Sequence, residues 1–407
     1  MSQFGVAPSL EPVVGEPSPP PIRVFSAEVI EERVVVVDER SWPRRIVDAI
    51  ASAYEWLFGI VSLWVGLAFL ATFPVLQFLS LGYLLEVSGR VSRTGRFRDG
   101  FVGVRTAARL GSAVLGTWLV LWPLRLVSDL WYSSKLISPY AGGTKAWRFA
   151  LIVLSLMVLV HLAWAWFRGA RLRHFLWPAP IKLFRRIRQG GMYAEARDAV
   201  WEFTHKLRLP YYFWLGCRGF AGAIAWLFAP VMMLVAAFYL PTGLAVLSGL
   251  AGSFFLAWVA VYLPFLHAQF AAENRFVAMF DVGRARQTFN RAPISHWLAL
   301  LVVLLFALPL YLLKIEFLER EVAWLPALVF VAFIAPARLL TGWAVGRGRH
   351  KPKSSPILLH LLMRGGMLPV LAIYLLIVYL SRYTSWYGSW SLFEQHAFLL
   401  PVPFLGL

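Results

Sequence analysis

The sequence has only one cysteine, Cys217, among 407 residues. A single cysteine excludes an intrachain disulfide framework and a cysteine-rich metal site. Charge is also scarce, at 15% of residues, whereas a soluble globular protein has about 25%. Hydrophobic residues make up 59% of the chain, and its mean hydropathy is +0.65. A chain of this composition cannot cover its apolar surface in water and therefore needs lipid as its solvent.

Motifs of known chemistry are missing as well. The sequence contains no His-Glu-x-x-His, no Cys-x-x-Cys, no phosphate-binding glycine-rich loop and no pair of acids within any apolar run. We therefore expect no metal and no cofactor, and we name no catalytic residue. The pI near 10.4 does not indicate a nucleic-acid partner, because the basic clusters alternate with apolar runs instead of lining a soluble, charge-rich fold.

What the sequence does have is basic charge in every second gap between its long apolar runs. These gaps hold 26 of the 39 Lys and Arg residues and only 7 acids. Short loops rich in Lys and Arg stay on the cytoplasmic side of a membrane, where anionic headgroups attract them. We therefore predict a protein of the cytoplasmic membrane with anionic lipids as partners, and cytoplasmic positions for 86–109, 168–209, 267–295 and 338–364.

The apolar runs are long enough to cross a bilayer as helices. About 20 apolar residues rising 1.5 Å each cover the hydrocarbon layer. The sequence therefore predicts an all-α, polytopic bundle of about eight transmembrane helices over residues 46–384. Residues 1–45 are expected to be a disordered or extended tail, and 385–407 an apolar tail that folds onto the outer surface of the bundle. The predicted spans are 52–73, 110–128, 149–167, 213–240, 244–266, 297–313, 322–345 and 366–384.

The side of the N-terminus is open. Eight crossings would place both termini outside, whereas residues 46–87 as a membrane hairpin would leave the N-terminus in the cytoplasm. Pro74 and Pro264 each lie near the end of an apolar run, and we expect each to end or kink its helix because proline removes a backbone donor and clashes with the preceding turn.

The basic gaps contain two further patterns. Residues 180–189 and 193–207 are predicted to be helices, and the first carries apolar side chains on one face and basic ones on the other, as in helices that lie on a membrane surface. In addition, Arg-Phe-x3-Phe-x3-Arg occurs at Arg96 and at Arg275. This motif predicts a weak parallel repeat of 56–128 and 247–313.

Four ionisable residues inside or near the predicted spans are candidate site residues. Arg218, Arg338 and Arg364 share a depth near the inner interface. They are either three independent arginines reaching the headgroups or one site for an anionic lipid. His161 lies in the middle of a span. It is either a neutral imidazole bonded to a neighbouring helix or a polar site within the membrane.

Two stretches resemble a known family. They are FPVLQFLSLGYLLEVSGRVSRTGRFRDG, residues 73–100, and YLPFLHAQFAAENRFVAMFDVGRARQTF, residues 262–289. Both are similar to prokaryotic multi-pass membrane proteins that are defined only by a domain of unknown function. A proline-broken first helix followed by Gly-Tyr-Leu-Leu-Glu and a basic loop carries the resemblance, which covers about half of the chain. It implies the fold and the membrane location and transfers no site residue.

Three classes of function remain. A non-enzymatic scaffold or envelope-organising, lipid-associated component fits the absence of paired membrane acids and the large basic gap 168–209. A transporter or lipid-handling permease is the alternative, because prolines within the spans can open a polar cavity. A membrane enzyme is the second alternative and lacks a catalytic constellation. The sequence does not identify protein partners.

Overall fold

The computed structural model describes residues 42–312, 324–381 and 392. The chain divides into two units, residues 1–49 and residues 50–407, and each is described by itself. In the first unit, the described residues 42–49 form the beginning of a helix.

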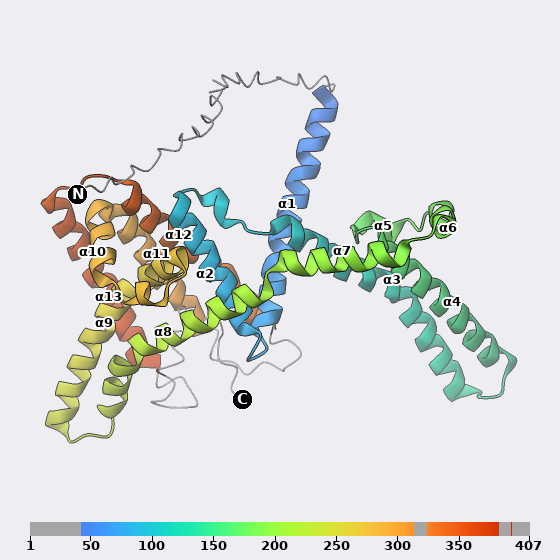
Figure 1. Cartoon of the computed structure of the whole chain (residues 1–407). Helices are drawn as coiled ribbons and strands as arrows, with labels where there is room; N and C mark the ends of the chain where they lie inside the picture. The colour runs from blue at the N-terminus through green and yellow to red at the C-terminus, as the bar shows by residue number, and fades with distance from the viewer. Residues whose placement is uncertain (1–41, 313–323, 382–391, 393–407) are drawn as a thin grey trace, which may run out of the picture. The chain divides into compact units, whose positions relative to one another are not determined.

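The described part of the chain is helical and contains no strand, as the sequence predicts (Figure 1). Two short 3-10 helices, η1 and η2, interrupt the series of α-helices. The elements are α1 (Trp42–Ala71), α2 (Gln77–Thr94), η1 (Phe97–Gly100), α3 (Val104–Ile137), α4 (Gly142–Phe167), α5 (Leu172–Leu176), α6 (Pro180–Gln189), α7 (Met192–Leu207), α8 (Leu209–Ala236), α9 (Thr242–Glu273), η2 (Phe276–Phe280), α10 (Val282–Arg291), α11 (Pro293–Leu312), α12 (Trp324–His350) and α13 (Ile357–Ser381).

The protein is a multi-pass membrane protein. Among the described helices, 7 are long and apolar enough to cross a bilayer, or 8 if α10 and α11, which meet at 112°, count as one bent span. Each predicted span coincides with one of α1, α3, α4, α8, α9, α11, α12 or α13 over the residues that the structure describes.

The predicted boundaries of the two tails need correction or stay open. Helix α1 begins at Trp42, so the predicted N-terminal tail 1–45 extends four residues too far, and residues 1–41 lie outside the described residues. Of the predicted C-terminal tail 385–407, only Leu392 is described. Its side chain is buried in the hydrophobic core.

Prolines act differently at the two predicted breaks. Pro74 lies between α1 and α2, where the chain turns back (Figure 1). This reversal matches the geometry of the hairpin alternative, although the side of the N-terminus stays a prediction. Pro264, in contrast, lies inside α9, which continues to Glu273, so it does not end its helix. Neighbouring helices in a bundle can compensate for the one backbone hydrogen bond that a proline removes.

Helix α2 lies at the centre of the packing and contacts α8, α9 and α12. All ten residues from Ser80 to Gly89 are buried. Glycine permits this close approach, because a Cβ on Gly82 would overlap the carbonyl oxygen of Tyr212, and a Cβ on Gly216 would overlap that of Phe78. Small residues at such crossings let membrane helices pack backbone against backbone.

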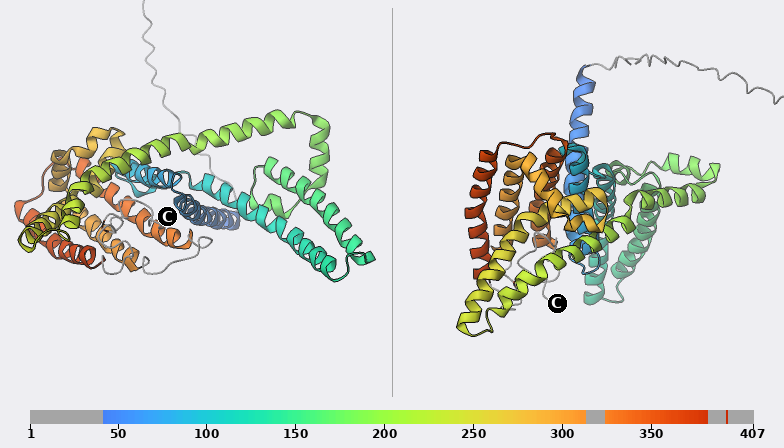
Figure 2. Two further views of the ribbon diagram at one scale, coloured as in Figure 1. Left: turned by 90° about the horizontal axis from the view of Figure 1, so that it is seen from below. Right: turned by 60° about the vertical axis from the view of Figure 1, so that its left-hand side comes forward.

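Helices α3 and α4 are packed much less extensively. They form an antiparallel pair whose main contacts are with each other and with α5 (Figures 1 and 2). Only five residues of α3 and four of α4 are buried, although both helices are strongly apolar. Their exposed leucines, valines and tryptophans are therefore positioned to contact lipid acyl chains.

The two Arg-Phe motifs adopt the same local backbone path. Gly95 and Asn274 each end a helix with positive φ, at 70° and 53°, and each donates its backbone N–H to the carbonyl four residues earlier. The next residues, Arg96 and Arg275, are extended, and a 3-10 helix follows in both cases. The parallel repeat of 56–128 and 247–313 stays a prediction that this local match supports.

The two predicted helices of the large basic gap are confirmed as α6 and α7. Neither helix contains a buried residue. In α6, the exposed side chains of Ile181, Phe184 and Ile187 share one face. Lys182 and Arg186 lie on the opposite side, whereas Arg185 and Arg188 line the same hollow as Ile181 and Phe184.

Candidate functional site

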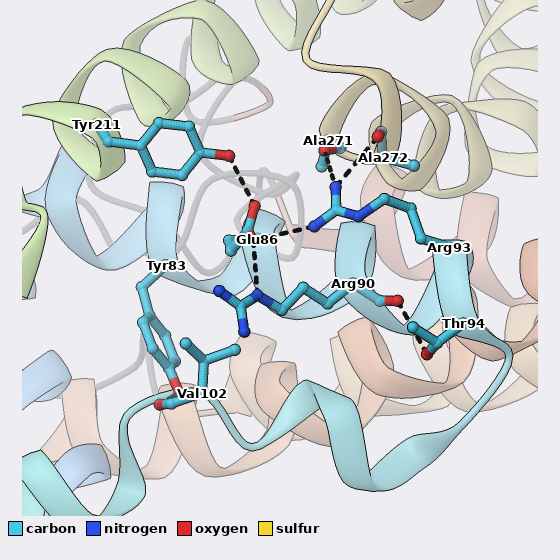
Figure 3. A network of polar contacts seen from close by, with 9 residues as sticks. All are labelled: Tyr83, Glu86, Arg90, Arg93, Thr94, Val102, Tyr211, Ala271 and Ala272. Atoms are coloured by element: carbon cyan, nitrogen blue, oxygen red, sulfur yellow. Dashed lines mark hydrogen bonds and ion pairs between the residues drawn. The ribbon is translucent and has the colours of Figure 1, made fainter. Parts of the chain in front are cut away.

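The buried carboxylate of Glu86 is the centre of a polar network where α2, α8 and α9 meet (Figure 3). Glu86 is only 2% exposed. Its Oε1 accepts hydrogen bonds from Arg90 Nε at 2.8 Å and from Arg93 Nη2 at 3.0 Å. Its Oε2 accepts one from the Tyr211 hydroxyl at 2.7 Å. The carboxylate is thus paired and hydrogen-bonded, as a buried charge must be.

Helical spacing positions these groups. Arg90 and Arg93 follow Glu86 by four and seven residues on α2, so all three side chains share one face. Tyr211 lies in the first turn of α8. Arg93 also donates to the backbone carbonyls of Ala271 at 3.2 Å and Ala272 at 3.1 Å. These carbonyls belong to the last turn of α9, where a positive charge is favourable.

The network joins three helices through one acid. The hydrogen bond to Glu86 raises the pKa of Arg90, so this guanidinium stays charged. Next to it, the Tyr83 hydroxyl donates to the carbonyl of Val102 at 2.7 Å and fastens the segment that follows η1 to α2. Removing Glu86 would leave two partly exposed guanidiniums without their acid, which should destabilise the packing of the three helices.

A second polar group lies among α8, α9 and α12. Arg338 is 4% exposed, and its Nη1 donates to Nδ1 of the fully buried His267 at 3.2 Å. Because arginine only donates, His267 carries its proton on Nε2, which then donates to the carbonyl of Gly219 at 3.2 Å. This pair ties α12 to α9 and α8.

The three candidate arginines have different partners. Arg218 donates to the side chain of Asn274 at 2.6 Å, and Arg364 donates to that of Asn290 at 3.4 Å. Arg338 faces His267 in the core instead of the headgroup region. These contacts pair each of the three side chains with a different residue, and the shared lipid site stays a prediction. Lipid binding by Arg218 or Arg364 alone stays a prediction.

His161 bonds a neighbouring helix. Its Nε2 lies 2.7 Å from the carbonyl oxygen of Phe175 in α5. A carbonyl only accepts, so His161 donates from Nε2, and this bond to a neighbouring helix agrees with the structural interpretation of the residue. A ligand at His161 stays a prediction.

Sequence reasoning missed the Glu86 network. It assigned Glu86 to the start of the basic gap 86–109, whereas α2 continues to Thr94. The spacing of Glu86, Arg90 and Arg93 is a signal for one helical face. The contribution of Tyr211 depends on a contact between residues 125 positions apart and has no local signal.

Comparisons with protein-family models, with curated proteins and with solved structures gave no match. The resemblance of residues 73–100 and 262–289 to a family of prokaryotic membrane proteins therefore stays a prediction. Among the described residues, no group of three or more His, Cys, Asp and Glu side chains is arranged to hold a metal ion.

Proposed function

We propose that this protein is a non-enzymatic scaffold of a prokaryotic cytoplasmic membrane, associated with anionic lipids through its cytoplasmic segment α5–α7. The observation that carries the proposal is α6. Its apolar side chains Ile181, Phe184 and Ile187 are exposed, and four basic residues accompany them within ten positions. A basic amphipathic helix of this kind lies in the headgroup region with its apolar face in the acyl boundary.

The packing of α2 supports a static role over transport. A permease needs a polar path that opens to water, whereas the residues from Ser80 to Gly89 are buried by three neighbouring helices. Glu86, which is buried in this packing, accepts hydrogen bonds from three donors. In this proposal the bundle anchors the protein in the membrane as a rigid body, and α6 and α7 contact the inner leaflet.

The position of α6 can be measured with spin labels on the full chain in nanodiscs. In a Cys217→Ser background, Phe184→Cys places a label on the apolar face, and Lys182→Cys places the matched control on the basic face. In discs with phosphatidylglycerol, we expect the label at 184 to lie about 5–10 Å into the leaflet, accessible to oxygen. The label at 182 should be accessible to a water-soluble nickel chelate. Equal nickel access at both positions would contradict the proposal.

A flux assay separates the scaffold from the permease. Proteoliposomes containing fluorescent phosphatidylglycerol should exchange this lipid between leaflets no faster than protein-free vesicles. Exchange that depends on the protein would contradict the scaffold and favour the lipid-handling alternative.

A further inference from the structure

The corner where α4 meets α5 holds buried polar atoms that have no partner. Trp164 on α4 and His174 on α5 are 6% and 8% exposed. Trp164 Nε1 and His174 Nδ1 have no hydrogen-bond partner among the described residues. Buried polar groups are nearly always paired, so each of these two atoms calls for a ligand group or an ordered water.

Basic side chains surround the same corner. The Arg168 guanidinium lies 5.8 Å from the centre of the Trp164 ring and donates to the carbonyl of Trp177 at 2.8 Å. Arg171 and Arg173 are exposed on the adjoining segment. The pKa of His174 is lowered to about 4. Burial is the largest cause, and the positive charges of Arg168, Arg173 and Arg171 lower the pKa further.

No acid in the neighbouring sequence balances this charge. Between Asp129 and Glu195 the chain has no Asp or Glu, and residues 168–188 alone contain seven bases. The indole N–H and the guanidinium groups are all donors. A cation or a ligand that only donates would not fit them, whereas a phosphate supplies several acceptor oxygens and negative charge.

We propose that Trp164, Arg168, Arg171, Arg173 and His174 form a binding site for one phosphate group, that of an anionic lipid headgroup of the inner leaflet. Trp164 lies one helical turn before Arg168, which directly follows α4, at the level where tryptophan N–H groups meet headgroups. His161 is not part of the site, because its Nε2 already donates to the carbonyl of Phe175. The site goes beyond leaflet contact by α6, and it rests on the proposed function only for the cytoplasmic placement of this corner.

Native mass spectrometry of the delipidated full chain in detergent can test the site. We expect phosphatidylglycerol to bind in preference to phosphatidylcholine, with one lipid lost in Trp164→Phe. This substitution keeps an aromatic ring, although a smaller one, and removes the N–H donor, so affinity should fall about tenfold. Trp166→Phe is the matched control, because Trp166 Nε1 already donates to the Thr117 hydroxyl at 3.1 Å. It should bind like the original protein.

A second variant guards against misfolding. Arg171→Gln with Arg173→Gln changes two exposed side chains and leaves the buried corner intact. It should also lower phosphatidylglycerol binding. Equal binding of the two lipids, or unchanged binding in both Trp164→Phe and the double variant, would overturn the site. Inorganic phosphate that binds in place of phosphatidylglycerol would overturn the lipid assignment and identify a free anion.

The pKa of His174 gives an independent measurement. A bound phosphate offsets the field of the arginines, so phosphatidylglycerol should move the pKa of His174 from about 4 toward its ordinary value of 6.5, as followed by NMR. No movement on saturation would contradict the site. This measurement is independent of the spin-label experiment on α6. If the label at 184 did not enter the leaflet, phosphatidylglycerol should still shift the pKa of His174.

Discussion

Helices α2 and α4 show opposite relations between composition and burial. Helix α2 contains three serines, a glutamate and two arginines, and 12 of its 18 residues are buried. Helix α4 has a long apolar run, Phe149–Phe167, without a charged residue, and only 4 of its 26 residues are buried. In water the apolar helix would be the buried one. In a membrane, lipid solvates the apolar helix, and the polar helix must be enclosed by protein.

This comparison assigns different sources of stability to the two regions. Around α2, backbone contacts at glycine and the Glu86 network hold α8, α9 and α12 together. Around α3 and α4, lipid can replace most of the contacts that a side chain loses. Substitutions should therefore be costly at α2 and mild on the exposed faces of α3 and α4.

The largest effect is expected for Gly82→Ala. The new Cβ would overlap the Tyr212 carbonyl, so α2 and α8 must separate, at a cost of about 3 kcal/mol or more in the free energy of unfolding. Gly66→Ala on α1 is the control, since a Cβ there meets no atom within 4 Å. It should be neutral or stabilising. Denaturation of both variants in mixed micelles would measure the difference, and equal stability would break the comparison.

Matched leucines sharpen the comparison. Leu84 on α2 is fully buried, whereas Leu156 on α4 is 60% exposed. Leu84→Ala should lower the free energy of unfolding by about 3 kcal/mol, because it leaves a cavity in the core. Leu156→Ala should change it by less than about 0.5 kcal/mol, as surface substitutions usually do. Similar losses for both would show that α4 is packed against protein.

A smaller effect is expected when Glu86 loses its charge. Glu86→Gln leaves Arg90 and Arg93 without an acid, but both are more than a third exposed. We therefore expect a loss of about 2 kcal/mol, below the value for fully buried pairs. Glu202→Gln removes the partner of Lys206 in an exposed pair and should have no measurable effect. Equal results for the two glutamates would mean that the network does not stabilise the bundle.

The sequence predicts one of these regions better than the other. Apolar runs identify the spans, including α3 and α4, because lipid selects for hydrophobic length alone. Helix α2 lacks such a run, and its central place follows from glycine contacts and from Tyr211, which only the fold brings together. The candidate site was therefore missed, whereas the amphipathic α6 was found from its periodicity.

The smallest effect concerns the corner beside α4. The pKa of His174 is lowered to about 4 in the folded protein, so the folded state binds this proton less readily than the unfolded state. The resulting stability is complete above about pH 6.5 and is lost as the pH falls toward 4. Between pH 7 and pH 5 we expect a loss of about 1 kcal/mol, because water screens the exposed arginines nearby. His174→Gln should lack this part of the pH dependence in thermal unfolding.

Contact with lipid tests the central claim most directly. The unaltered protein can be reconstituted with a phospholipid that carries a photoreactive group along its acyl chain, and the crosslinked residues can be mapped by mass spectrometry. The account predicts crosslinks on the exposed faces of α3 and α4 and none on residues 80–89 of α2, which protein encloses on all sides. Crosslinks within residues 80–89 would contradict it.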